Sequence, residues 1–398
     1  MKTIFYFARK IKNYIIPKKN NPYPVVVEPT GTIKEPIGSV LLSYLEYPLL
    51  WAENSTNFNG HSNAWESRTI ARIFQELGYR VVAINYKDRD FVPHRYYDVV
   101  FDIFENLGRW SSSLDHSTKK FLHCTGSDPN YQNSSEIRRV NAVNARRNAA
   151  YSPKRLIAQP ELTYKSMDVA DAISLIGNEK TCATYPQKYW PKMKLVPVTA
   201  SFLPYTKTVD ELVPLKREFL WFFGKGAVHK GLDLVLEVFY RCKDLTLNVV
   251  GNLEQENDFM KMYKRELLHT NNIHYHGFLY PSSQEFQNIL KNTFCFIAPS
   301  CSEAISTAAV TCLTIGLYPI VSRDTGVTLP DGFGTYLEAC SIEEIEQEVR
   351  LVHGMSKQTL VEQIQIIQMD ALTRYSRDTF RNMMKQYILK NIELTNIR

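Results

Sequence analysis

Short apolar runs alternate with longer amphipathic stretches along most of this chain. The apolar runs have the length of strands, and the amphipathic stretches repeat their apolar residues at helical spacing. In the first half this pattern predicts strands at 39–44, 80–85, 98–101, 120–123 and 172–176. It predicts helices at 64–77 and at 134–147. Asn63 with Glu66 makes a capping-box-like start for the first of these helices, and Gly78 makes a suitable stop.

The same alternation restarts after a proline-containing stretch at 197–214. Strands are predicted at 219–223, 245–250, 273–276, 295–298 and 318–321, and helices at 230–240, 258–268, 283–291 and 304–315. Alternating strands and helices predict parallel sheets with helices on both faces. The fold class is therefore α/β, with two Rossmann-like domains that face each other across a cleft. Ligands of such sheets bind at the carboxyl ends of the strands.

The pattern also sets the expected domain limits. Residues 1–37 are predicted to be a basic amphipathic helix and a linker, residues 38–203 the first Rossmann-like domain on the acceptor side of the cleft, and residues 204–375 the second. A last helix, 376–398, is expected to pack back on the first domain.

The charge of the chain lies at its start. The net charge is +6, from 47 basic and 41 acidic residues, and the first twenty residues hold six basic residues and no acidic one. The body is therefore neutral, which argues against a nucleic-acid-binding protein. Within 1–16 the apolar residues share one helical face: Ile4, Phe7, Ala8, Ile11 and Ile15. This pattern predicts docking on an anionic membrane surface, and the alternative is a helix that packs on its own protein.

Other features narrow the location and the chemistry. The chain has seven cysteines, an odd number, without a CxxC pair, which indicates reduced thiols in the cytoplasm and no zinc site. No apolar run has the length of a transmembrane helix, and basic residues interrupt any signal-peptide core. Asp88-Arg89-Asp90 is the sole D-x-D candidate for a divalent metal, but a charged loop is the favoured interpretation. No cofactor or metal is expected.

Two strand ends carry candidate chemistry. The first is the segment 222–231, in which a strand ends in a glycine loop with Lys225 and Lys230 before a helix starts. Glycines let the backbone approach an anion and lysines neutralise phosphate, although for this segment alone a plain strand–helix turn is the favoured interpretation. The second is 299–307, where Glu303 precedes a helix and either binds sugar hydroxyls or caps that helix.

Together the two segments resemble glycosyltransferase family 4, the retaining GT-B enzymes. Lys225 stands at the Arg position of the family's G-R-L-x-x-x-K-G motif, and Lys230-Gly231 match its Lys-Gly pair. Further matches to the P-S-x-x-E motif, the nucleobase loop and the G-x-P turn are Pro299-Ser300 with Glu303, His276 to Leu279, and Gly316 to Pro319.

The resemblance implies roles for individual residues. Lys230 and Lys225, with Gly224, would stabilise the departing diphosphate, and Glu303 would orient the donor sugar. Donor contacts are implied for Gly60 in a first glycine loop, for Gly277 and Phe278 in the nucleobase loop, and for Ala304, Ile305 and Ser306. His123, at a strand end, would contact the sugar from the first domain, or it is a satisfied core histidine. Thr311 replaces the family's second Glu, which holds the ribose, and offers one hydroxyl.

The predicted function is metal-independent, retaining transfer of a hexosyl group from a nucleotide sugar to a glycan or lipid-linked acceptor. Membrane docking suggests cell-envelope or polysaccharide biosynthesis, in the cytoplasm or peripherally on the inner face of the plasma membrane. The altered residues after Glu303 and at 311 support an alternative, a non-catalytic GT-B protein that binds a nucleotide sugar or glycan. A hydrolase or epimerase on the same fold is a third possibility, because fold alone does not decide among them.

Overall fold

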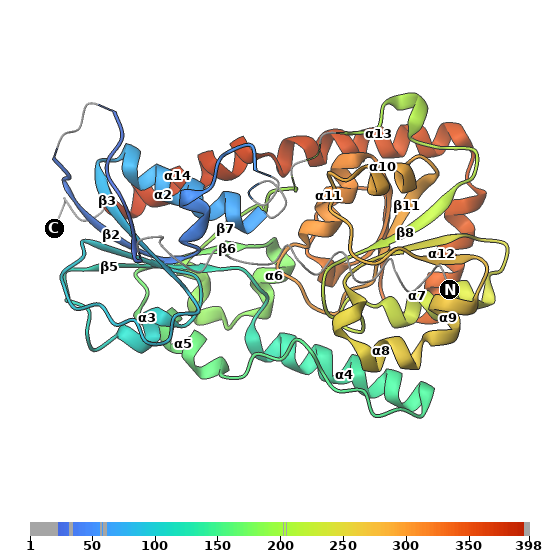
Figure 1. Cartoon of the computed structure of the whole chain (residues 1–398), viewed down its shortest axis with the longest axis horizontal. Helices are drawn as coiled ribbons and strands as arrows, with labels where there is room; N and C mark the ends of the chain where they lie inside the picture. Colours follow the sequence, from blue (N-terminus) through green and yellow to red (C-terminus); the bar gives the residue numbers. More distant parts are fainter. Residues whose placement is uncertain are drawn as a thin grey trace, which may run out of the picture.

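Each half of the chain forms its own sheet (Figure 1). The computed structural model describes residues 23–31, 35–55, 58, 62–201, 203 and 205–393. The first sheet has the order β1-β3-β2-β4-β5-β6-β7, with β1 antiparallel to β3 and all other pairs parallel. Its strands are β1 (Val25–Val27), β2 (Gly38–Tyr44), β3 (Tyr79–Asn85), β4 (Val99–Asp102), β5 (Lys119–Cys124), β6 (Ala172–Ile176) and β7 (Met193–Val196).

The second sheet is entirely parallel and has the order β10-β9-β8-β11-β12-β13. Its strands are β8 (Glu218–Phe222), β9 (Leu247–Val250), β10 (Ile273–Tyr275), β11 (Thr293–Ala298), β12 (Tyr318–Ser322) and β13 (Thr335–Leu337). The central strand β11 is buried along its whole length, as expected for a parallel strand with helices on both faces.

Helices connect these strands in both halves. The first half contains α2 (Ser62–Glu76), α3 (Asn106–Trp110), α4 (Pro129–Arg147), α5 (Pro160–Val169) and α6 (Glu179–Thr184). The second half contains α7 (Leu232–Arg241), α8 (Asn257–Met262), α9 (Lys264–His269), α10 (Gln284–Leu290), α11 (Thr307–Ile315), α12 (Ile342–Gly354), α13 (Lys357–Arg374) and α14 (Arg377–Glu393). Short 3-10 turns lie at Tyr47–Leu50, Gln187–Lys192, Val209–Glu211, Leu253–Gln255 and Arg323–Thr325.

Several elements differ from the sequence prediction. β1 lies inside the stretch predicted as a linker, and β1 and β13 have three residues each, too few to show a periodic pattern. The helix predicted at 258–268 is divided into α8 and α9, because Tyr263 between them departs from helical backbone angles. In the part of the chain that is described, no helix is long and apolar enough to cross a bilayer.

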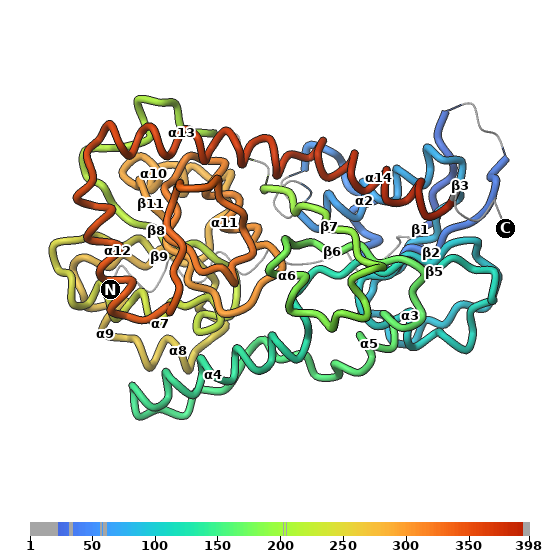
Figure 2. Tube along the Cα trace, turned by 180° about the vertical axis from the view of Figure 1, so that it is seen from behind, coloured from blue at the N-terminus to red at the C-terminus, as the bar shows by residue number. Residues whose placement is uncertain are grey.

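Two helices pass from one half of the molecule to the other. α14 lies against α2 and β7 of the first half, where Phe380 packs edge-on against Trp65 and Arg381 and Lys385 pair with Glu76. α4 follows a strand of the first sheet but extends beneath the second half, beside α8, in both Figure 1 and Figure 2. The two halves are therefore joined by helices as well as by the chain connection near residue 204.

Two predicted features lie outside the described residues. The amphipathic helix expected at 1–16 is one, and the loop that contains Gly60 is the other. Their predicted roles remain predictions.

Candidate functional site

A cleft of about 480 Å³ lies where the carboxyl ends of the two sheets meet. In the first sheet β2 lies between β3 and β4, and in the second sheet β8 lies between β9 and β11. The order in which successive strands join the sheet therefore reverses beside β2 and beside β8. Such switch points open a crevice at the strand ends. Tyr44 at the end of β2 and Ile103 just after β4 line one wall, and Gly224 after β8 and Glu303 after β11 line the other.

The charged centre of the second wall is a pair formed by Lys230 and Glu303. The ammonium of Lys230 and the carboxylate of Glu303 form an ion pair, with 9% and 11% of the two side chains exposed. Burial lowers the pKa of Lys230, and the positive charge of Arg155 lowers it further. The structure thus brings together two residues that are 73 positions apart and both predicted from the sequence as donor-site residues.

Gly231 explains how these two loops approach each other. It has φ +73°, and a Cβ at this position would lie 2.5 Å from the carbonyl oxygen of Pro299. A side chain would therefore push the start of α7 away from the loop that carries Glu303. Gly231 is therefore required by the close backbone contact, and Lys230 supplies the charge.

The amides of the glycine loop are already bonded within the protein. The carboxylate of Glu256 accepts hydrogen bonds from the backbone N–H of Gly226, at 2.5 Å, and of Ala227, at 3.1 Å. These two amides are therefore not directed at a ligand. Gly224 and Lys225 line the cleft, so the side chains of this loop carry the positive charge that faces a bound anion.

The start of α11 forms the floor beside Glu303. Ser306 caps this helix, because its hydroxyl accepts a hydrogen bond from the N–H of Ala309, and Ile305, Ser306 and Thr307 line the cleft. The aligned peptide dipoles of a helix start favour negative charge. Ala304, by contrast, is buried and does not line the cleft.

Thr311 does not face the cleft. Its side chain is fully buried. The hydroxyl donates a hydrogen bond to the carbonyl oxygen of Thr307 at 2.8 Å and accepts one from the N–H of Ser201 at 3.2 Å. Both capacities of the hydroxyl serve the packing of α11 against the first half. The ribose contact expected for Thr311 is not available in this arrangement.

The predicted nucleobase loop forms one end of the cleft. Phe278 lines it together with Leu279 and Tyr280, and the rings of Phe278 and Tyr280 meet edge to face at 5.0 Å. Gly277 lies behind this surface with φ +71°, where it turns the chain rather than lining the cleft.

His123 lies in the core behind the first wall. Its side chain is fully buried, Nδ1 is 2.8 Å from the hydroxyl of Ser174, and burial lowers its pKa to about 3. Its ring packs near Tyr44 and Phe101. The direct sugar contact predicted for His123 is therefore corrected: the side chain lies in the core and does not line the cleft, although its Nε2 has no hydrogen-bond partner among the described residues, and Tyr44 lines the cleft beside it.

Two charged residues that line the cleft were not predicted as site residues. Glu66 on α2 faces inward, with hydrogen bonds from the N–H and hydroxyl of Thr199, both at 3.3 Å, and burial raises its pKa to about 7. Arg155, in the connection between α4 and α5, lines the same cleft. The sequence analysis assigned Glu66 to a capping box, so its direction into the cleft was not predicted. Arg155 was not predicted because it lies in a stretch without a periodic pattern.

A side pocket of about 350 Å³ opens from the first wall. It shares several lining residues with the cleft, namely Tyr86, Ile103, Phe104, Thr125 and Arg155. Apolar and aromatic side chains such as Leu122 and Tyr185 line its interior. Such a surface suits the face of a sugar ring or an acyl chain.

The D-x-D candidate has a structural role in its loop. Asp88 accepts hydrogen bonds from the N–H of Asp90 and Phe91 and from the hydroxyl of Tyr23, and neither aspartate lines the cleft. Within the described residues, no group of three or more His, Cys, Asp or Glu side chains is placed to hold a metal ion. All seven cysteines are free thiols.

Solved structures show that the chain has the GT-B fold of two Rossmann-like domains. Sucrose-phosphate synthase from Thermosynechococcus elongatus superposes with a TM-score of 0.62 at 9% identity, over 91% of this chain and 100% of that one. Anabaena HepE in complex with UDP and glucose gives 0.54 at 11% identity, over 89% and 99%. The N-terminal domain of Candida albicans trehalose-6-phosphate phosphatase gives 0.53 at 9% identity, over 93% and 99%.

The family assignment comes from the second half of the sequence. Residues 206–358 match the family described as Glycosyl transferases group 1. The resemblance deduced from Lys225, Lys230 and Glu303 is thereby confirmed. No curated protein sequence matches the chain.

Proposed function

We propose that this protein is a retaining glycosyltransferase that moves a hexosyl group from a nucleotide sugar to a glycan or lipid-linked acceptor. The observation that carries the proposal is the pairing of Lys230 with Glu303, beside Lys225, at the switch point of the second sheet. Positive side chains at this edge suit a diphosphate, and the carboxylate between them suits sugar hydroxyls.

Each cleft residue then has a defined task. Lys225 and Lys230 stabilise negative charge on the departing diphosphate, the kind of electrostatic contribution that is usually largest in such reactions. Glu303 accepts hydrogen bonds from the donor sugar. Phe278 and Tyr280 form the surface for the nucleobase. The leaving phosphate accepts the proton of the acceptor hydroxyl, so the reaction requires neither a protein base nor a metal ion.

Closure of the two halves supports this chemistry by excluding water, which competes with the acceptor as nucleophile. We assign the side pocket beside Phe104 to the acceptor, because it opens into the cleft from the opposite wall to Lys230. Its apolar interior favours an acceptor with a sugar ring or lipid portion over a small ion.

The test is turnover with a panel of UDP-, GDP-, ADP- and dTDP-sugars and mixed glycan and lipid-linked acceptors. We expect transfer from one donor class, with the anomeric configuration of the donor retained in the product by NMR. Activity should persist in EDTA. Transfer that EDTA abolishes and manganese restores would contradict metal independence, and inversion would contradict the stereochemical assignment.

A second function is favoured by one observation. Thr311 is committed to internal hydrogen bonds, so the cleft lacks the ribose contact expected there. A GT-B protein that binds a nucleotide sugar or glycan without transfer fits that change. Binding measured beside turnover separates the two functions: saturable donor binding with no product from any acceptor supports the binding protein. Free sugar or an isomerised donor formed without acceptor indicates a hydrolase or epimerase.

We also propose that residues 1–16 hold the protein on the cytoplasmic, inner face of the plasma membrane for cell-envelope or polysaccharide synthesis. The support is the basic, one-sided apolar pattern of this segment. Each basic residue near an anionic surface contributes about 1 kcal/mol, and salt screens that attraction. Deletion of residues 1–20 should abolish binding to phosphatidylglycerol-containing vesicles and leave transfer to a soluble acceptor intact. Persistent vesicle binding would contradict this location.

A further inference from the structure

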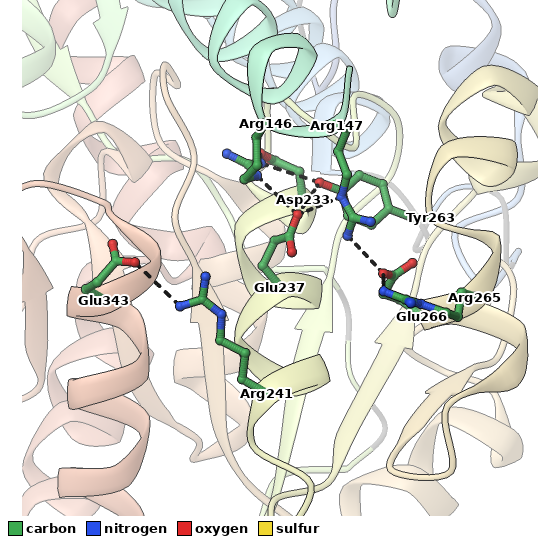
Figure 3. Close-up of polar contacts among 9 residues, drawn as sticks. All are labelled: Arg146, Arg147, Asp233, Glu237, Arg241, Tyr263, Arg265, Glu266 and Glu343. Atoms are coloured by element: carbon green, nitrogen blue, oxygen red, sulfur yellow. Dashed lines mark hydrogen bonds and ion pairs between the residues drawn. The ribbon is translucent and has the colours of Figure 1, made fainter. Parts of the chain in front are cut away.

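The segment 129–155, called here the α4 strap, belongs in sequence to the first half but is fixed to the second. Figure 3 shows Arg146 and Arg147, at the end of α4, pointing toward acidic residues on α7 and α9. The contacts are Arg146 Nη2 to Asp233 Oδ2 at 2.6 Å, Arg147 Nε to Glu237 Oε1 at 2.7 Å and Arg147 Nη2 to Glu266 Oε1 at 2.9 Å. Asp233 and Glu266 are almost wholly buried, so loss of either arginine contact would leave an uncompensated buried charge.

The end of the strap is joined to the glycine loop. The hydroxyl of Tyr151 donates to Glu256 at 2.9 Å, and Glu256 is the carboxylate that holds the amides of Gly226 and Ala227. Lys154 pairs with Asp258 at 2.5 Å. The strap and the donor loop therefore form one connected unit.

Arg155 lies where this unit meets the cleft. Its N–H donates to Glu136 at 2.8 Å, and its carbonyl accepts from Gln132 at 2.6 Å, so α4 fixes its backbone. The side-chain stem lies against Gly226, where an added Cβ would be 3.0 Å from Cγ of Arg155. The side chain lines the cleft, and among the described residues its guanidinium has no hydrogen bond or ion pair.

The hydrogen-bond and ion-pair partners of the other cleft groups show which positive side chains remain for a ligand. Three basic side chains line the cleft in the described structure, and Lys230 is already paired with Glu303. In the glycine loop, the amides of Gly226 and Ala227 are bound to Glu256. Lys225 and Arg155 are the remaining positive groups at the place where a donor diphosphate would lie. A guanidinium binds phosphate through two parallel N–H···O bonds, which an ammonium does not reproduce.

We propose that Arg155, presented by the α4 strap, binds the donor diphosphate together with Lys225. This assignment rests on the proposed function, and it makes the donor site a composite of both halves of the sequence. The strap then moves with the second half when the cleft opens, and Arg155 remains beside the glycine loop.

The experiment measures calorimetric binding of UDP, GDP, ADP, CDP and dTDP to the full chain. The tightest of these diphosphates is then compared with its own monophosphate and nucleoside. Arg155→Ala should weaken diphosphate binding by about ten- to a hundredfold, the range for losing a charged hydrogen-bonding partner. Nucleoside binding should stay unchanged. Arg155→Lys should recover part of the loss.

The matched control is Arg138→Ala, which removes the same charge from an exposed position of the same strap, outside the cleft lining. It should leave diphosphate binding within about twofold. Equal diphosphate affinity in Arg155→Ala and wild type, with Lys225→Ala weakened, would overturn the assignment of Arg155 and leave the proposed function standing. Failure of wild type to bind any of the five diphosphates would count against the proposed function, and the assignment of Arg155 would fall with it.

Discussion

At the scale of single residues, Lys230 is the side chain on which the donor site depends most. It is 8% exposed, pairs with Glu303 and lines the cleft, so a bound diphosphate would meet its charge in a largely dry setting. Lys230→Ala should lower kcat/KM by ~2–4 kcal/mol of transition-state stabilisation. Steady-state kinetics measure this, with Lys243→Ala, an exposed lysine outside the cleft lining, as the control. Wild-type kinetics in a folded Lys230→Ala protein would remove Lys230 from the mechanism.

Glu66 predicts a pH dependence of stability. Burial raises its pKa from 4.5 to about 7, so the folded state holds a proton that the unfolded state releases at lower pH. The contribution of Glu66 to the free energy of unfolding should therefore be fully present below about pH 4.5 and fall, by roughly 3 kcal/mol, as pH rises to 7. Urea denaturation of wild type and Glu66→Gln at several pH values measures the difference, which should change across this window.

Glu76 provides the control for Glu66, because its pKa is shifted in the opposite direction. Partial burial raises the pKa of Glu76, but hydrogen bonds from Arg381 and Lys385 outweigh this effect and lower it. Its contribution to stability is present above pH 4.5 and is lost as pH falls. Glu76→Gln should thus give a difference of opposite slope, and a flat difference for Glu66→Gln would show that its carboxyl is solvated.

At the scale of elements, the contact between α4 and α7 is a polar junction of several ion pairs. Glu237 accepts hydrogen bonds from both Arg146, at 3.1 Å, and Arg147, at 2.7 Å, with 14% of its side chain exposed. Glu237→Gln removes the charge that both guanidinium groups share. The free energy of unfolding should fall by about 1–3 kcal/mol, measured by urea denaturation.

Glu343 offers the matched control, because it pairs with Arg241 at 3.5 Å with 75% of its side chain exposed (Figure 3). Exposed pairs contribute little, so Glu343→Gln should cost less than about 1 kcal/mol. Equal effects of the two substitutions would show that α4 is not held by its ion pairs.

At the scale of the whole molecule, α14 returns the end of the chain to the first half. Phe380 is fully buried there and packs edge-on against Trp65 at 5.8 Å between ring centroids. Phe380→Ala leaves a cavity under the last helix and should cost ~3–5 kcal/mol of unfolding free energy. Lys390→Ala, an exposed position of the same helix, should change it by less than about 0.5 kcal/mol. A small loss for Phe380→Ala would mean that α14 is not part of the cooperative fold.

The sequence by itself determined the alternation of elements and the donor-side loops. Strand runs such as 39–44 and 295–298 are encoded locally, because one or two buried faces impose a pattern on consecutive residues. Lys225, Lys230 and Glu303 follow such strands directly, so their place at one sheet edge followed from the strand assignments and the motif. The three-residue strands β1 and β13 were not predicted, because neither segment shows a clear periodic pattern, whereas β10, of the same length, was.

Only the tertiary structure decided which of the remaining candidates face the cleft. Thr311 and His123 stand at motif positions, yet packing of the first half against the second buries one and the core of the first sheet buries the other. Arg155 reaches the site because α4 docks on helices about a hundred positions away in sequence. A local pattern records which face of an element is apolar, but it does not record which distant surface covers that face. The composite character of the site follows from that docking.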